Sequence, residues 1–220
     1  MTKFLKTQWL RIVVHVGVWL PLLWIIADGF LGQLGPEPIR EIILRTGKTA
    51  LILLILCLAC TPLNTLLRFR SALRVRRALG LYAFMYASFH LLTFVGVDYG
   101  FDVELLREAI FEKPYALVGL AGFLILLPLA LTSTKDWMKR LGQNWRKLHY
   151  GIYFAALLVI VHFVWLVKLD VREPLTYGAI VVALLLMRVP RIRSTLVRLT
   201  TLSLGRSSDS ANKTVGHIES

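Results

Sequence analysis

Six long apolar blocks, joined by short polar loops, constrain this chain more than any other feature of its sequence. They cover residues 12–27, 49–67, 78–97, 115–132, 149–167 and 175–187. A membrane-spanning helix needs about 20 mainly apolar residues, so six helices use roughly 120 residues and leave no room for a separate soluble domain. No segment alternates with the period of a strand, and no internal repeat is evident. We therefore expect an all-α, polytopic membrane protein built as a bundle of six transmembrane helices.

The chain divides into two parts by composition. Residues 1–190 hold the six apolar blocks, and residues 191–220 form a basic and polar tail that we expect to be disordered. The first block follows Lys3, Lys6 and Arg11, as a signal peptide would, but no small-residue cleavage site comes after it. We expect it to remain as the first span.

The Lys and Arg residues are distributed unevenly among the loops, as expected for a membrane protein with a fixed orientation. The formal net charge is +13, yet 19 of the 26 Lys and Arg residues fall before the first block, in alternate loops or in the tail. The loop of residues 98–113 carries five acids against two bases. Because short loops rich in Lys and Arg stay in the cytoplasm, both termini are predicted inside and the acidic loop outside. The excess charge needs no nucleic acid to explain it, and we expect no nucleic-acid partner.

Two histidines in apolar surroundings are the strongest candidates for chemistry. His90 and His162 lie in the third and fifth blocks, and ionisable residues inside a membrane are costly and usually functional. His90 lies 13 residues after Arg77, and His162 lies 13 residues after His149, or roughly 20 Å along each helix. Two imidazoles at matched depth on facing helices are the arrangement that holds a haem iron from both sides. We predict such a haem near the outer face.

His149, at the inner end of the fifth block, is a candidate ligand for a second haem about 20 Å from the first. No histidine stands level with it in the third block, where Arg77 occurs instead. Arginine stays protonated and is a poor iron ligand, but it suits a haem propionate or a flavin phosphate. On an unbroken helix the side chains of His149 and His162 would point about 140° apart around the axis, so they would not lie on the same face.

Other interpretations of these residues remain open. Each histidine alone could simply hydrogen-bond a neighbouring helix, and a haem-free transporter or proton channel would use the histidines as a proton relay. An intramembrane metallohydrolase is less favoured, because no acid accompanies His90 or His162 in its block. Cys57 and Cys60 are expected to be buried structural thiols, and His15 to be structural.

Six segments together resemble the haem-binding membrane subunit of the bacterial periplasmic methionine sulfoxide reductase system, in the ferric reductase-like transmembrane group. The resemblance covers residues 5–187. It rests on residues 76–81 (Arg-Arg-Ala-Leu-Gly-Leu), 86–93 (Tyr-Ala-Ser-Phe-His-Leu-Leu-Thr), 113–115 (Lys-Pro-Tyr), 129–133 (Leu-Ala-Leu-Thr-Ser), 145–150 (Trp-Arg-Lys-Leu-His-Tyr) and 162–168 (His-Phe-Val-Trp-Leu-Val-Lys).

The resemblance implies a function that composition does not. Electrons from quinol or a flavin reductase would cross the bacterial inner membrane to a periplasmic molybdopterin catalytic subunit that repairs oxidised proteins. It implies haem b, one or two per chain, and FMN, and it carries axial roles onto His90, His149 and His162. The chain itself would perform no substrate chemistry, and membrane lipid would surround it. We expect the loops at residues 29–48 and 98–113 to dock the catalytic subunit.

Overall fold

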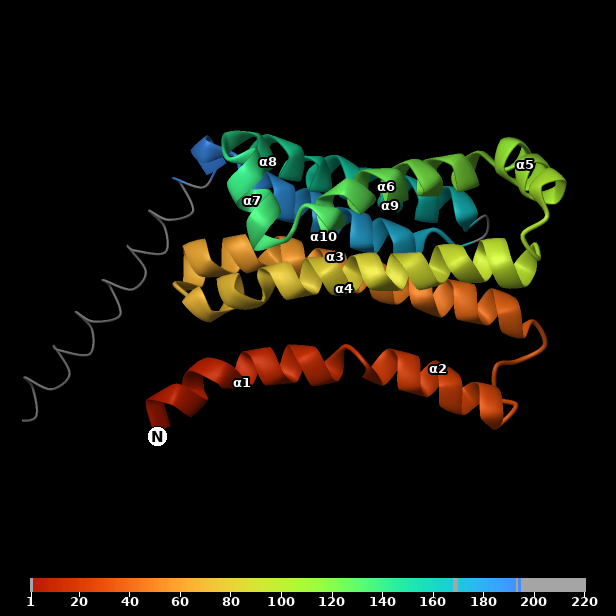
Figure 1. The fold of residues 1–220 in the computed structure, drawn as a ribbon, viewed down its shortest axis with the longest axis horizontal. Helices are drawn as coiled ribbons and strands as arrows, with labels where there is room; N and C mark the ends of the chain where they lie inside the picture. The colour runs from red at the N-terminus through yellow and green to blue at the C-terminus, as the bar shows by residue number, and fades with distance from the viewer. Residues whose placement is uncertain (1, 168–169, 193, 195–220) are drawn as a thin grey trace, which may run out of the picture.

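The computed structural model describes residues 2–167, 170–192 and 194, and every regular element in this part of the chain is helical (Figure 1). The all-α prediction is therefore confirmed. The elements are α1 (Thr2–Gly17), α2 (Leu20–Phe30), α3 (Pro38–Leu67), α4 (Arg70–Leu92), the π-helical η1 (Thr93–Asp98), α5 (Val103–Glu112), α6 (Pro114–Leu131), α7 (Lys135–Leu141), α8 (Gln143–His149), α9 (Gly151–Leu166) and α10 (Arg172–Leu186). The predicted disordered tail lies almost wholly outside the described residues.

Five helical segments are long and apolar enough to cross a membrane, among the residues described. They are Gln8–Phe30, Pro38–Leu67, Arg70–Asp98, Pro114–Leu131 and Gln143–Leu166. The sixth predicted block forms α10, whose 15 residues rise about 22 Å, less than a hydrocarbon core of about 30 Å. The six-span prediction is thus confirmed for five spans and not for the last, and the inward placement of both termini stays a prediction.

The first apolar block is two helices rather than one. α1 ends at Gly17 and α2 starts at Leu20, with Pro21 in the first turn of α2. Proline has no N–H to donate and is best tolerated in the first turn of a helix, where none is needed. The hydroxyl of the fully buried Tyr86 in α4 donates to the Val18 carbonyl at this break, over 2.6 Å. The break therefore fastens the first block to α4.

Two antiparallel hairpins make the centre of the bundle. α3 pairs with α4, α6 pairs with α9, and α10 packs on α9 and α3 (Figure 1). The rings of Phe84 in α4 and Phe123 in α6 stack with centroids 5.4 Å apart and so join the hairpins. The core residues concentrate on α3 and the facing side of α4, including Leu51, Leu54 and Leu58.

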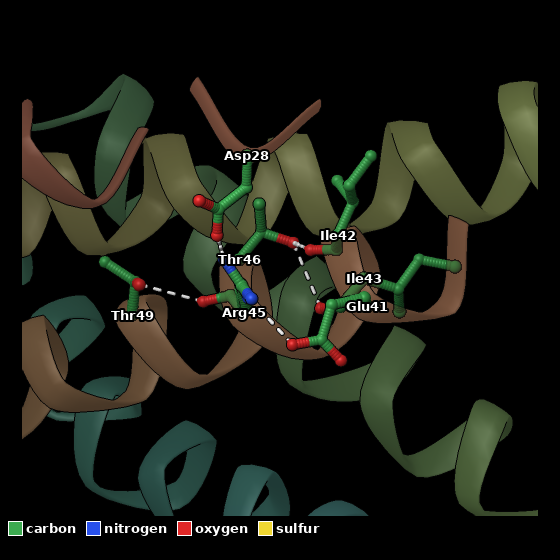
Figure 2. A network of polar contacts seen from close by, with 7 residues as sticks. All are labelled: Asp28, Glu41, Ile42, Ile43, Arg45, Thr46 and Thr49. Carbon is green, nitrogen blue, oxygen red and sulfur yellow. Dashed lines mark hydrogen bonds and ion pairs between the residues drawn. The ribbon is translucent and has the colours of Figure 1, made fainter. Parts of the chain in front are cut away.

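A charged network ties α2 to α3 at the end of the bundle opposite the N-terminus. Arg45 Nη1 donates to Asp28 Oδ2 over 2.5 Å, and Arg45 Nε donates to Glu41 Oε1 over 2.7 Å (Figure 2). Asp28 is only 7% exposed, so its carboxylate needs this partner. The same end carries α5, whose N-terminus is capped by the Asp102 carboxylate. The predicted outer loops thus gather at one end.

Candidate functional site

His90 of α4 and His162 of α9 lie next to each other, as their matched depth predicts. Their ring centroids are 6.1 Å apart, and the ring planes are nearly perpendicular at 87°. Both side chains are at least partly enclosed by the surrounding helices. The two hairpins therefore each supply one imidazole to a common place near the end of α4, since His90 lies two residues before Leu92, where α4 ends.

Each imidazole is oriented by a backbone carbonyl of its own hairpin. His90 Nδ1 donates to the Ile43 carbonyl over 2.8 Å, and His162 Nδ1 donates to the Tyr115 carbonyl over 2.7 Å. A carbonyl oxygen can only accept, so Nδ1 carries the proton in both rings. The neutral ring then keeps a lone pair on Nε2, and neither Nε2 has a hydrogen bond within the described residues. This is the tautomer that binds a metal through Nε2.

Two glycines make room for the rings. A Cβ on Gly47 of α3 would lie 2.8 Å from His90 Nδ1, and a Cβ on Gly119 of α6 would lie 2.6 Å from His162 Nδ1. Side chains do not approach ring atoms this closely. Each histidine ring thus lies against a backbone carbonyl and a glycine of the helix that faces it. In both cases the glycine follows the carbonyl residue by one helical turn.

The two hairpins repeat the same contacts at the same spacing. Each histidine lies 47 residues after its carbonyl partner. An offset of 72 residues relates the first hairpin to the second, and it pairs Ile43 with Tyr115, Gly47 with Gly119, His90 with His162, and Arg77 with His149. This internal repeat is not evident from the sequence, because the two copies share contact positions rather than a run of identical residues.

The pair of imidazoles fits a haem iron better than a bare metal ion. Two metal–imidazole bonds of about 2.0–2.1 Å, together with the two ring radii, span roughly 6 Å, which matches the centroid separation of 6.1 Å. A structural or catalytic zinc site needs three or four protein ligands. In the described part of the chain, no group of three or more His, Cys, Asp or Glu side chains is placed to hold a metal. Haem needs only two axial ligands from the protein.

His149 is the third predicted ligand, and it lies at the other end of the bundle. Its Nδ1 donates to the Trp145 carbonyl over 3.0 Å, and its ring stacks on Trp145 with centroids 3.9 Å apart. Its Nε2 is buried and has no hydrogen-bond partner within the described residues. The ring therefore shows the same tautomer as the outer pair and an unused ligand atom. The helix is interrupted at Tyr150, between α8 and α9, so the angle of an unbroken helix does not apply.

Arg77 does not lie beside His149 in the way the sequence predicts for a shared cofactor. It is exposed and lines a pocket between α1 and α4. Its neighbour Arg76 is half-buried, donates to Thr61 Oγ1 over 3.3 Å, and interacts electrostatically with His149.

Arg188 is a further candidate residue that the sequence did not single out. Its guanidinium donates to the Tyr153 hydroxyl and to the Leu58 carbonyl, each over 2.6 Å, while its Nε is buried without a partner in the described part of the chain. By its place in the sequence, this residue belongs only to the basic region that follows the last apolar block. Arg76 thus brings positive charge near His149, and Arg188 brings positive charge into the bundle beside Tyr153 of α9 and Leu58 of α3.

Comparison with known proteins agrees with this architecture. The family described as "Ferric reductase like transmembrane component" matches residues 46–160. The protein-methionine-sulfoxide reductase heme-binding subunit MsrQ of Xanthomonas euvesicatoria is 44% identical over 186 residues, covering 81% of this chain and 85% of that protein. The MsrQ subunit of Caulobacter vibrioides is 42% identical over 182 residues, covering 80% and 87%. No solved structure matches the chain.

The fold and its paired histidines define a helical membrane protein of the ferric reductase-like transmembrane class. Within that class, the chain belongs to the family of the MsrQ subunits of protein-methionine-sulfoxide reductase.

Proposed function

We propose that this chain is a haem b protein of the bacterial inner membrane that passes electrons to a periplasmic methionine sulfoxide reductase. Quinol or a flavin reductase supplies the electrons, and a molybdopterin catalytic subunit receives them for the repair of oxidised proteins. The names of the MsrQ relatives support the haem and the reductase system. FMN is a second proposed cofactor.

One observation carries the proposal: two carbonyl-oriented imidazoles on separate hairpins have ring centroids 6.1 Å apart, and neither Nε2 atom has a hydrogen bond to a described residue. His90 and His162 would hold the outer haem, whose iron supplies reversible one-electron chemistry when bound. The Ile43 and Tyr115 carbonyls fix the tautomer and orientation of the two rings, so that each Nε2 lone pair would stay available to a haem. The surrounding helices limit the access of water.

A second haem at the inner end is supported by the unpartnered Nε2 of His149. Arg76 and Arg188 supply positive charge at that end, which suits the propionates of a haem. Arg77, proposed from the sequence as a cofactor-binding residue, lies on the α1 side of α4 instead. The outer end, with α5, is proposed to dock the catalytic subunit.

The test is absorption spectroscopy of the purified protein in mild detergent, oxidised and then reduced with dithionite. We expect b-type bands in the wild type, which lose the contribution of the outer haem in His90→Ala and in His162→Ala. His149→Ala should remove only the contribution of the inner haem. His15→Ala is the matched control, because His15 pairs with Tyr82, and it should keep the full spectrum.

A colourless wild type, expressed with haem supplied, would overturn the electron-transfer function and favour the proton channel or transporter. Full spectra in both His90→Ala and His162→Ala would remove these residues as ligands.

A further inference from the structure

A basic pocket lies between α1 and α4, apart from the paired histidines. It has a volume of about 240 Å³, and α1 lines it with Arg11 and His15 while α4 lines it with Arg74, Arg77 and Leu81, among others. His15 Nδ1 and the Tyr82 hydroxyl are 2.6 Å apart, and this contact joins the two helices beside the pocket. Two helices distant in sequence therefore build one cationic cavity.

No carboxylate with a described side chain neutralises the charge in this pocket: none forms an ion pair with Arg11, Arg74 or Arg77. Arg74 Nη2 donates to the Ser71 hydroxyl. Three guanidinium groups around one cavity repel each other, and an anion that binds between them relieves the repulsion.

The position of the pocket indicates what kind of anion reaches it. Arg74 and Arg77 lie in the first turns of α4, directly after the basic segment that begins at Arg68. The N-terminus of α4 is at the end of the bundle that also carries α7 (Figure 1), and at such span ends the headgroups of a bilayer are expected. On α1, the side chains of Ile12, Val13 and Val16 are more than half exposed, so this helix offers an apolar surface beside the pocket. An amphiphile with a phosphate head and acyl chains satisfies both surfaces.

We propose that this pocket binds the phosphate group of an anionic phospholipid. Arginine suits phosphate because its planar guanidinium donates two parallel hydrogen bonds. Basic pockets at the cytoplasmic ends of membrane helices hold such headgroups. A volume of about 240 Å³ holds a headgroup, whereas pockets for whole cofactors run from about 300 to 1,000 Å³. The proposal does not depend on haem binding.

The test compares three probes on the full chain in neutral detergent. Native mass spectrometry and the thermal unfolding midpoint are measured with cardiolipin or phosphatidylglycerol, with phosphatidylcholine, and with FMN or inorganic phosphate. We expect one anionic phospholipid to remain bound per chain and to raise the unfolding midpoint, and phosphatidylcholine to do neither.

The variant Arg11→Gln/Arg74→Gln/Arg77→Gln should weaken the binding of the anionic lipid on the order of a hundredfold. The matched control, Arg70→Gln/Lys135→Gln/Lys139→Gln, removes three exposed cations outside the pocket and should bind the lipid as the wild type does. Helix content by circular dichroism and a monodisperse elution profile confirm that both variants fold.

Equal loss of lipid in the pocket variant and the control would overturn the proposal, because charge alone would then explain binding. FMN or phosphate that displaces the lipid, and that only the pocket variant fails to bind, would overturn the phospholipid as the occupant.

Discussion

A histidine that donates its Nδ1 proton to a backbone carbonyl cannot turn its ring without losing that bond. In this protein the Ile43 and Tyr115 carbonyls impose the same tautomer on two neighbouring rings. The glycines at 47 and 119 leave the space that each ring occupies. Orientation is therefore set by the backbone of the facing helix rather than by other side chains.

Replacing either glycine with alanine tests this arrangement. Gly47→Ala and Gly119→Ala place a Cβ within 2.8 Å and 2.6 Å of an imidazole nitrogen, and such overpacking costs about 1–3 kcal/mol. We expect each ring to be displaced and the haem content per chain to fall at least tenfold, while helix content by circular dichroism stays the same. The pyridine haemochrome assay measures the haem.

Gly17→Ala is the control, because a Cβ there meets no atom within 4 Å. It should leave the haem content unchanged. Wild-type haem content in Gly47→Ala and Gly119→Ala would show that the rings do not need this space.

The sequence indicates the histidines but not their surroundings. Their apolar neighbours and matched depths follow from residue spacing, which is enough to pair His90 with His162. The carbonyl partners cannot be predicted in this way, because the hydrogen bonds depend on the rotation of each helix against its neighbour. Arg76 and Arg77 show the same limit: they are adjacent in sequence, yet only Arg76 is half-buried.

Helix ends explain where the predicted elements differ from the observed ones. The first block divides near Pro21, and the fifth divides at Tyr150, which lies between α8 and α9. Hydropathy alone does not reveal the break near Pro21, because apolar residues continue through it. The break at Tyr150 follows a basic segment, so the predicted start of the fifth block lies within two residues of the start of α9. The last block is 13 residues long in the sequence and forms a helix of 15 residues. The helical type of the elements was therefore more predictable than their number.

The ion pair between Asp28 of α2 and Arg45 of α3 is expected to hold α1 and α2 against the rest of the bundle. Asp28→Asn removes the charge that the buried carboxylate offers to Arg45, and hydrogen bonds to charged groups contribute about 1.5–3 kcal/mol. We expect the free energy of unfolding to fall by about 1–3 kcal/mol. Thermal unfolding in detergent, with limited proteolysis at residues 32–37, measures the effect.

Glu37→Gln is the comparison for this tie, because the ion pair of Glu37 with Arg40 is largely exposed. Exposed pairs contribute about 0–1 kcal/mol, so this variant should unfold nearly as the wild type does. A loss in Asp28→Asn no greater than that in Glu37→Gln would contradict the role of the tie.

At the scale of the whole molecule, the distribution of charge predicts the orientation in the membrane. Cysteines introduced at Gln33 and at Lys139 lie at opposite ends of the bundle, and both side chains are exposed. In intact spheroplasts, a membrane-impermeant maleimide should label Gln33→Cys and should label Lys139→Cys only after lysis. Native Cys57 and Cys60 are buried, so the wild type should stay unlabelled. The reverse pattern would place both termini outside.

The repeated hairpins also bear on how the protein is made. Each histidine takes its carbonyl partner from its own hairpin, 47 residues earlier. During synthesis the first hairpin can insert and set its ring before the second has left the ribosome. The later association of two finished halves then creates the facing pair. The histidine pair is thereby completed only when the two hairpins associate, so cofactor capture belongs to that last step rather than to the insertion of either hairpin.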